Sequence, residues 1–383
     1  MNAAFLAFAH LRWHWARSVV MVLVAAVILA VPLVSQTLLR GSEQSLTARA
    51  DATPLVLGAR GSQIDLVMGA LYFGEDRAQP VTMKAAEAVW ESDLALPIPL
   101  NTMFTASGAR IVGTTLDYFS FRGLEIAQGR RFAVLGEAVL GASVARRLNL
   151  SPGDTIVSAP ENLFDLDGVY PLEMTVTGVL APTGTPDDEA VLTDVKTTWV
   201  IAGIGHGHQD VVAEGDDPVT ASAALEQYNR ITPDNIDSFH FHGAPEDYPL
   251  TAVLIEPYDT RSETILRGRY LEPENPLQLV VPSDVVDRLV ERIFRIAALL
   301  DAVAGLVGLA AAAAVALALF LAWRLRAPEL DTARRIGAGR GMILRLAGAE
   351  IAILLGAALL MAQGIVIVVQ SRSNTLLTWL IAQ

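Results

Sequence analysis

The sequence contains no cysteine and only two lysines, and both shortages exclude whole classes of chemistry. Without cysteine there is no disulfide framework, no zinc–thiolate site and no thiol catalysis. Neither Lys84 nor Lys196 follows a glycine-rich loop, so this chain carries no phosphate-binding loop of the kind that nucleotide hydrolysis requires. The metalloprotease pattern H-E-x-x-H and the nucleophile elbow G-x-S-x-G are also absent.

Charged residues are scarce as well, at 18% of the chain, where soluble proteins carry about 25%. Hydrophobic residues make up 52%, and the mean hydropathy is +0.41. Residues 40–290 hold 36 acidic and 17 basic side chains, whereas residues 324–345 hold six arginines and two acids. An acidic central region excludes nucleic-acid binding, which requires a basic surface. We interpret its carboxylates as a solvated surface, because their spacing reveals no acid/base pair.

Apolar residues gather in three stretches, at 19–39, 296–323 and 343–370. Each approaches or exceeds the roughly 20 residues that a helix needs to cross a hydrocarbon core of about 30 Å. Since lipid cannot satisfy unpaired backbone groups, we expect three transmembrane helices. The first stretch has a cleaved signal peptide as its alternative, but its apolar run is longer than a signal core and no small-x-small cleavage motif follows. We therefore interpret it as an uncleaved anchor.

Basic residues set the expected orientation. Arg12 and Arg17 precede the first span, and the arginines of 324–345 lie around the loop between the second and third spans. Because cytoplasmic loops are enriched in basic residues, we expect the N-terminus and this loop inside and the acidic region outside. The predicted order is an interfacial helix (1–18), the first span (19–39), an outer domain (40–290), the second span with a stalk (291–323), a cytoplasmic loop (324–342), the third span (343–370), and a tail or the beginning of a fourth span (371–383).

Within the outer domain, short runs of β-branched residues recur between helical patterns, which together predict an α+β domain. The expected strands lie at 138–145, 154–159, 172–182, 197–203 and 251–257, and the expected helices at 81–93 and 218–231. The stretch that precedes the second span is helical in period, with Ser283 or Asp284 as its N-cap. We expect this stretch to continue into the span as one long helix.

The loop at 324–342 is basic and interrupted by glycine. Residues 328–336 predict a short helix, because Pro328 suits its first turn, Arg334 and Arg335 suit the negative end of its dipole, and Gly337 stands where a C-cap glycine would. Taken alone, these features describe an ordinary basic loop between two membrane helices.

A more specific pattern runs through the same residues. A glutamate–hydrophobic pair is followed by an arginine, a hydrophobic-Gly-Ala triplet, a basic residue and an acid inside the next span. The residues concerned are Glu329, Leu330, Arg334 with its neighbour Arg335, Ile336, Gly337, Ala338, Arg340 and Glu350. In this spacing the chain resembles the permease subunits of the MacB, LolC and FtsX superfamily of ABC transporters.

The outer domain extends this resemblance. The segments 54–73, 109–119, 136–150 and 177–194 are similar to one branch of these permeases. The implied fold is an α-helical transmembrane bundle with a large α+β, MacB-like periplasmic domain, made of a porter-type subdomain and a more distal one. Members of the superfamily have four spans, whereas three are visible here, so we expect a truncated chain or a divergent three-span form.

The resemblance also implies a function and partners. The chain would be a non-catalytic permease subunit of the bacterial inner membrane, without a cofactor of its own, whose short loop helix docks on a dimeric ABC ATPase that binds ATP and Mg²⁺. It would act in contact with membrane lipid, together with a second copy or a paralogue. A periplasmic adaptor or lipoprotein would be a further partner. The substrate exported or extracted would be a lipoprotein, a lipid, a peptide or a small molecule. An FtsX-like signalling scaffold and an unpowered metal-linked membrane protein are the alternatives. An outer domain of about 250 residues favours the transporter branch.

Four of the six histidines form two H-x-H pairs, His206/His208 and His240/His242. On a strand, this spacing puts both imidazoles on one face, which suits zinc, and Asp210 and Asp237 lie nearby in sequence. The alternative interpretation is a glycine/histidine loop and a strand with two exposed rings.

Asp301 and Glu350 are the ionisable residues within the expected spans. Such residues usually have a function, but both lie near a membrane face, where exposure lowers their cost. We expect Glu350 to pair with Arg345 or Arg340, and a structural or coupling role rather than a proton relay.

Overall fold

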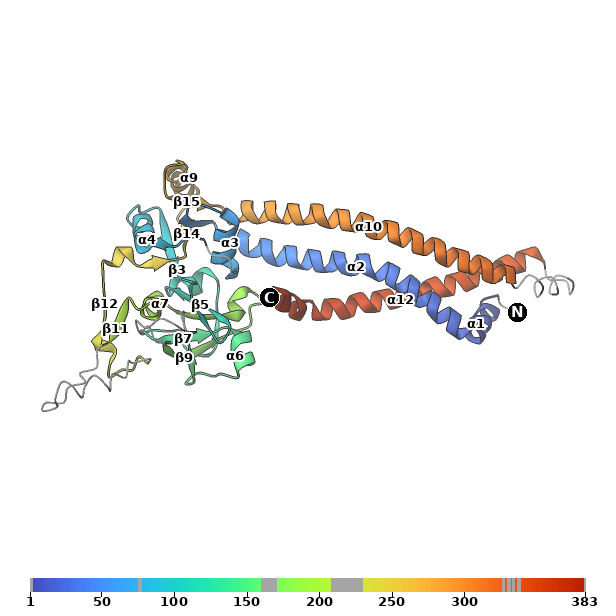
Figure 1. The fold of residues 1–383 in the computed structure, drawn as a ribbon, viewed down its shortest axis with the longest axis horizontal. Coiled ribbons are helices and arrows are strands. Elements are labelled where there is room, and N and C mark those ends of the chain that lie inside the picture. Colours follow the sequence, from blue (N-terminus) through green and yellow to red (C-terminus); the bar gives the residue numbers. More distant parts are fainter. Residues whose placement is uncertain are drawn as a thin grey trace, which may run out of the picture. The chain divides into compact units, whose positions relative to one another are not determined.

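The computed structural model describes residues 3–74, 78–159, 171–207, 230–325, 328, 332, 335 and 339–381. Some side chains within the long helices, including those of residues 38–46 and Asp301, lie outside this description. By its internal contacts the chain divides into two units. The first comprises Met1–Ser45 and Val290–Gln383, and the second comprises Leu46–Leu289 (Figure 1).

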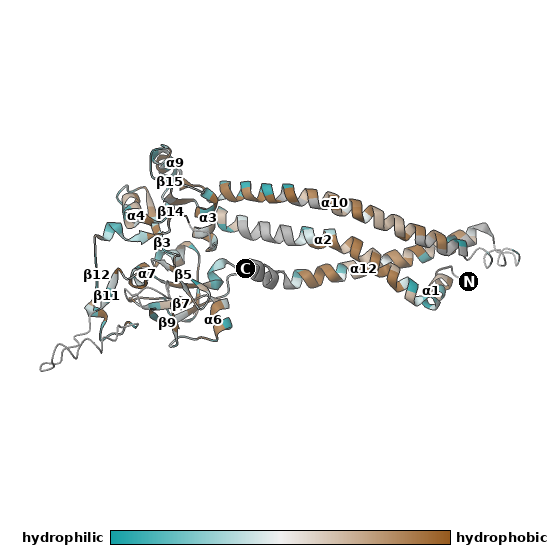
Figure 2. Ribbon diagram, viewed as in Figure 1, coloured by the Kyte–Doolittle hydropathy of each residue, from teal (hydrophilic) through white to brown (hydrophobic). Residues whose placement is uncertain are grey.

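The first unit is helical. Its elements are α1 (Ala3–Trp13), most of α2 (Trp15–Asp51), most of α10 (Pro282–Leu325) and α12 (Arg340–Ile381). Among the described residues, two helical stretches are long and apolar enough to cross a membrane, Trp15–Thr37 and Leu344–Ser371, and the most apolar 18-residue segments within them have mean hydropathies of 2.7 and 2.6. The apolar segment Ala302–Leu317 of α10 is shorter. Figure 2 shows the hydrophobic colouring of these helices.

The apolar side chains of this unit face outward. Only 11% of the most apolar 18-residue segment in each of the two long stretches is buried, and Leu309 and Leu360 are 71% and 76% exposed. A core helix of a soluble protein would bury such residues, and a continuous exposed apolar surface marks contact with a partner or a membrane. We therefore take the two long stretches to lie in lipid. The third span remains a prediction.

Two helix boundaries differ from those expected from sequence. α10 begins at Pro282, so neither Ser283 nor Asp284 is its N-cap; proline suits the first helical position, where its missing N–H has no partner to lose. The helix then runs unbroken to Leu325, which confirms the expected continuity. α12 continues to Ile381, because residues 371–381 contain neither proline nor glycine, and the segment predicted as a tail or a fourth span extends the same helix.

The second unit contains a four-stranded antiparallel sheet in the order β15-β1-β14-β3. These strands are β1 (Leu55–Ala59), β3 (Ala95–Leu100), β14 (Ala252–Pro257) and β15 (Leu277–Val280). The helices α3 (Gln63–Tyr72), α4 (Met83–Trp90) and α9 (Thr260–Arg269) accompany them, and β2 (Val81–Thr82) pairs with β13 (Pro249–Leu250). Leu57, Val89, Val253 and Leu266 belong to its buried core.

The larger sheet has the order β4-β5-β10-β7-β9-β6, with β8 paired to β9. Its strands are β4 (Thr105–Ala106), β5 (Ala109–Thr114), β6 (Ile126–Gly129), β7 (Glu137–Leu140), β8 (Thr155–Val157), β9 (Glu173–Leu180) and β10 (Ala190–Asp194). Two of its pairings, β5 with β10 and β7 with β9, are parallel. The associated helices are α5 (Asp117–Phe121), α6 (Ala142–Leu148), the 3₁₀ turn η1 (Pro186–Glu189) and α7 (Val195–Ile201).

A separate two-stranded ribbon consists of β11 (Gly205–Gly207) and β12 (Phe239–Phe241). The 3₁₀ turns η2 (Ile236–Ser238) and η3 (Pro245–Asp247) flank β12. Sheets and helices together confirm the predicted α+β class, and β8, β9, β14 and α4 fall where the sequence placed them. The helix expected at 218–231 lies outside the described residues except for Arg230 and Ile231.

Of two further predicted strands, one is too long and the other is wrong. The one at 138–145 stops at Leu140, and α6 begins after Gly141. The one at 197–203 is the helix α7, whose N-cap Asp194 accepts a hydrogen bond from the Lys196 amide at 2.8 Å. α7 buries Val195, Thr198 and Trp199, at helical spacing, so burial outweighs the β-propensity of its Thr, Trp, Val and Ile residues.

Candidate functional site

A buried ion pair fixes the last turn of α2 in the second unit. The guanidinium of Arg49 donates to both carboxylate oxygens of Asp187, with Nη1–Oδ2 and Nη2–Oδ1 distances of 2.5 and 3.2 Å. The two side chains are 5% and 1% exposed. A bidentate pair at this depth is directional as well as charged, so it fixes the helix end in one orientation.

The same guanidinium reaches two further elements. Its Nη2 donates to the Tyr118 hydroxyl of α5 at 3.0 Å, and that hydroxyl donates to Asp187 Oδ1 at 2.7 Å. Its Nε donates to the carbonyl of Leu71 in α3. Arg49 therefore ties α2 to α3, α5 and η1 at once, and every partner in this network is inside the second unit.

The electrostatics of the network favour its charged form. Burial would raise the pKa of Asp187, but the charge and hydrogen bonds of Arg49 outweigh burial, so the pKa of this carboxyl lies below its usual range. Burial raises the pKa of Tyr118, and the Asp187 carboxylate raises it further, so the phenol stays protonated and can donate. Burial and the nearby charge of Arg49 lower the pKa of Arg122, whose Nη1 donates to Thr53 at 2.8 Å.

Gly141 makes room for the turn that carries Asp187. A Cβ atom at this position would lie 2.3 Å from the carbonyl oxygens of both Asp187 and Asp188, which no side chain can tolerate without displacing η1. The Asp188 carboxylate in turn accepts hydrogen bonds from the amides of Thr183 and Gly184 at 2.9 and 2.8 Å. No sequence pattern predicts this site, because its two charges are 138 residues apart and neither stands in a recognisable motif.

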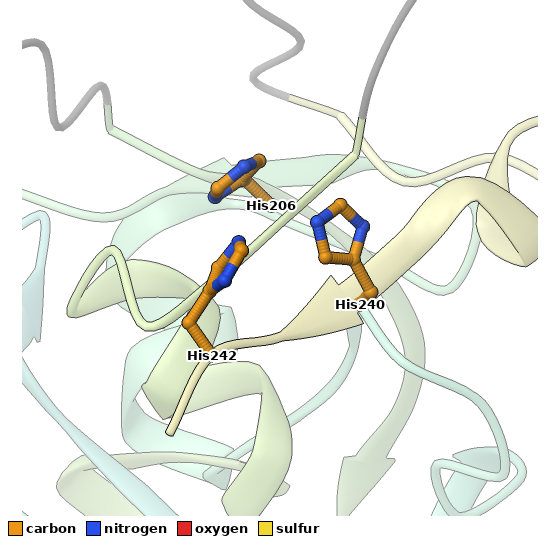
Figure 3. A group of neighbouring side chains, drawn as sticks. All are labelled: His206, His240 and His242. Atoms are coloured by element: carbon orange, nitrogen blue, oxygen red, sulfur yellow. The ribbon is translucent and has the colours of Figure 1, made fainter.

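The histidine pairs meet on the β11–β12 ribbon. His206 and His240 are direct partners in the antiparallel register, and His242 follows two residues after His240 (Figure 3). The ring centroid of His206 lies 5.0 Å from that of His240 and 4.8 Å from that of His242. The centroids of His240 and His242 are 4.8 Å apart. Their ligand nitrogens all lie within 4.8 Å of one another. His206 and His242 are exposed, and His240 is half-buried.

The other predicted metal-site residues do not join this group. His208 and Asp210 lie outside the described residues. Asp237 lies in η2 and is exposed, but it is not among the converging ligands. The alternative interpretation, a glycine/histidine loop at 203–210, does not hold for His206, which is in a strand.

Most of the predicted coupling residues lie outside the residues that the structure describes. Glu329, Leu330, Arg334, Ile336, Gly337 and Ala338 lie outside the described residues. Pro328, Thr332 and Arg335 are helical and exposed, and the Thr332 hydroxyl donates to the Pro328 carbonyl at 2.9 Å. Arg340 is the first residue of α12.

Glu350 is buried in the first unit, and its Oε1 lies 3.2 Å from Nδ1 of His10 in α1. The sequence had suggested Arg345 or Arg340 as its partner; Arg345 is exposed, and the side chain of Arg340 is not described. Asp301 lies within α10, with its side chain outside the description.

These observations define a membrane protein that consists of a unit of apolar helices and an α+β domain. A family model described as "MacB-like periplasmic core domain" matches residues 19–231, more than half of the chain. The chain belongs to the MacB-like family of ABC transporter permeases.

Two solved structures are similar to the chain. One is the periplasmic region of MacB from Actinobacillus actinomycetemcomitans, with 12% identity, a TM-score of 0.38, and coverage of 62% of this chain and 92% of that one. The other is the extracellular domain of the noncanonic ABC-type transporter YknZ from Gram-positive bacteria, with 10% identity, a TM-score of 0.34, and coverage of 59% and 98%. No curated protein matches the chain.

Proposed function

We propose that the chain is the permease subunit of a MacB-type ABC transporter and relays movement from a separate ATPase to its periplasmic domain. The observation that carries this proposal is the anchoring of α2. This helix runs unbroken from an apolar, membrane-compatible segment to Arg49, whose buried hydrogen bonds hold three elements of the α+β domain. A displacement of α2 along its axis would therefore be delivered to the domain core.

The lengths of α2 and α10 support the same proposal. At 1.5 Å per residue, the 37 residues of α2 span about 55 Å and the 44 residues of α10 about 66 Å, well beyond a hydrocarbon core of about 30 Å. The first turns of α10 are also held by the domain: Val285 and Val286 are buried, and Arg288 donates to Gln63 of α3 at 3.0 Å. Two helices that leave the membrane without a break are suited to transmit motion.

The energy source in this proposal is a partner subunit. Family membership, together with the missing phosphate-binding loop, supports a non-catalytic chain that docks on an ABC ATPase through the cytoplasmic segment around Arg335. The same proposal includes a third span in α10, a cytoplasmic N-terminus and a dimeric permease. The basic residues of 324–345 support this orientation.

Site-directed cross-linking tests the docking. Because the chain has no cysteine, Arg335→Cys provides a single reactive site, and Trp90→Cys in α4, where the tryptophan is 61% exposed, provides the control. Each variant, in its native membranes, is labelled at its thiol with a maleimide that carries a photoreactive group, is irradiated, and its products are identified by mass spectrometry. We expect an ABC ATPase, recognised by its phosphate-binding loop, attached at position 335 and not at position 90. Absence of any ATPase from position 335 would contradict the proposal and favour an unpowered membrane protein.

A further inference from the structure

We propose that His206, His240 and His242 form a binding site for one divalent transition-metal ion of the class that imidazole ligands prefer, and we test it with zinc. The site lies wholly within the second unit and requires nothing of the transport proposal. Its three ligands come from the two strands of one ribbon, so a bound ion would cross-link β11 to β12.

The strand register brings the imidazoles together. His206 and His240 are opposite each other, and the ladder continues past β12, where the His242 amide donates to the Ile204 carbonyl at 3.0 Å. Residues opposite each other and residues two apart on a strand share one face, so all three rings project from the same side, as Figure 3 shows. With Zn–N bonds of about 2.0–2.1 Å, the nitrogens of a tetrahedral site lie about 3.4 Å apart. The three ligand nitrogens already lie within 4.8 Å of one another, so rotation of the side chains suffices to bring them to this spacing.

One ring is already oriented as a ligand. Nδ1 of His240 lies 3.2 Å from the carbonyl oxygen of Ser238. A carbonyl oxygen can only accept, so Nδ1 carries the hydrogen, and the lone pair of a neutral imidazole is then on Nε2. Metal-bound histidines are commonly held by this kind of backbone hydrogen bond, which fixes the tautomer and the ring orientation.

The opposite face of the ribbon is held by the domain core. The ring of Phe241 contacts Trp199 and Tyr248, with centroid distances of 6.3 and 6.1 Å. Across the ribbon, Gly205 and Gly207 leave room for phenylalanine rings, because a Cβ at either position would come within 2.7 Å of Phe241 or Phe239. The alternation of Gly-His-Gly against Phe-His-Phe therefore directs apolar groups inward and imidazoles outward. The contacts of Phe241 therefore hold the backbone that carries the ligands against the domain core.

The donor set determines the class of ion. Three imidazoles without a thiolate suit zinc, copper or nickel, whereas magnesium and calcium prefer oxygen ligands. Three protein ligands leave a fourth tetrahedral position for water or another small ligand.

Isothermal titration calorimetry of the full-length chain with zinc chloride tests the site. The protein is purified in detergent micelles with an affinity tag that lacks histidine, and is stripped with a chelator beforehand. We expect one zinc ion per wild-type chain, and binding at least 100-fold weaker after combined His206→Ala, His240→Ala and His242→Ala substitution. His14→Ala, which removes an exposed histidine of the first unit, is the matched control and should bind as wild type.

Two measurements keep the test decisive. Circular dichroism shows whether the triple variant remains folded, and the single variant His242→Ala, at an exposed position, should weaken zinc binding at least 10-fold. X-ray absorption at the zinc edge should show imidazole nitrogens at about 2.0 Å. Wild-type protein that binds no zinc, or a triple variant that retains wild-type affinity, would overturn the proposal.

Discussion

Replacement of Asp187 by asparagine removes the counter-charge of Arg49 and leaves the size of the side chain unchanged. The guanidinium would then be a buried, uncompensated charge, because Arg49 is 5% exposed and its remaining partners, the Tyr118 hydroxyl and the Leu71 carbonyl, are neutral. Breaking a buried ion pair by removing one partner costs about 3–5 kcal/mol. The asparagine oxygen still accepts one hydrogen bond, so we expect the lower end, about 3 kcal/mol.

Equilibrium unfolding of the full-length chain in urea, in detergent micelles, measures this loss. In a background whose other five tryptophans are replaced by phenylalanine, Trp199 is the single tryptophan, and because it is buried in the second unit beside Tyr248, its fluorescence reports the unfolding of that unit. A domain of this size has a urea m-value of about 2–3 kcal/mol/M, so the midpoint should fall by about 1–1.5 M. Arg267→Gln, which removes an exposed i,i+4 pair with Glu263 in α9, is the control and should cost only about 0.2–0.5 kcal/mol. If Asp187→Asn shifts the midpoint no more than this control, the network does not anchor α2.

The pH dependence of the same experiment has a fixed sign. The folded-state pKa of Asp187 is lowered, so its stabilisation is complete above the unfolded-state pKa of about 3.9 and is lost as the pH falls through the folded value. The midpoint difference between wild type and Asp187→Asn should therefore be constant above pH 5 and shrink below about pH 4. A difference that persists unchanged in acid would mean that the asparagine acts through packing rather than charge.

Two further predictions concern topology and packing. A membrane-impermeant maleimide should label Trp90→Cys in intact cells, and Arg335→Cys only after the membrane is permeabilised; equal labelling of both would reverse or abolish the proposed orientation. Gly141→Ala should lower the unfolding free energy by about 1–3 kcal/mol, because its Cβ would displace the backbone of Asp187. The control is Gly268→Ala in α9, where a Cβ would meet no atom within 4 Å; it should be neutral or stabilising by up to about 1 kcal/mol. An unchanged urea midpoint for Gly141→Ala would show that η1 can shift without cost.

The membrane helices and the α+β class could be predicted from the sequence because their signals are local. Apolar stretches identify α2 and α12 within a single window, and alternating residues identify β9 and β14. The error at α7 has a physical cause that was visible in the sequence. Asp194 is a good N-cap, and Val195, Thr198 and Trp199 have helical spacing, whereas the β-branched composition favours a strand.

The sites depended on long-range pairing, which one sequence does not reveal. The H-x-H spacing predicted which rings share a face of a strand, but not that the two strands are neighbours. The alternation of glycine with histidine in β11, facing phenylalanine with histidine in β12, is a signal that could have suggested the pairing. Arg49 and Asp187 offered no such signal, because each is one of many charges in an acidic domain.

Motion of the periplasmic domain in response to nucleotide is the central claim, and a distance measurement tests it most directly. Trp90→Cys, carrying the single thiol of the chain, is spin-labelled and assembled with its ATPase, made cysteine-free, in lipid nanodiscs. Double electron–electron resonance then measures the distance between the labels of the two permease copies. If the domain moves as proposed, the labels show one distance distribution without nucleotide and a distinct one with trapped ATP. An identical distribution in both states, in an assembly that hydrolyses ATP, would contradict it.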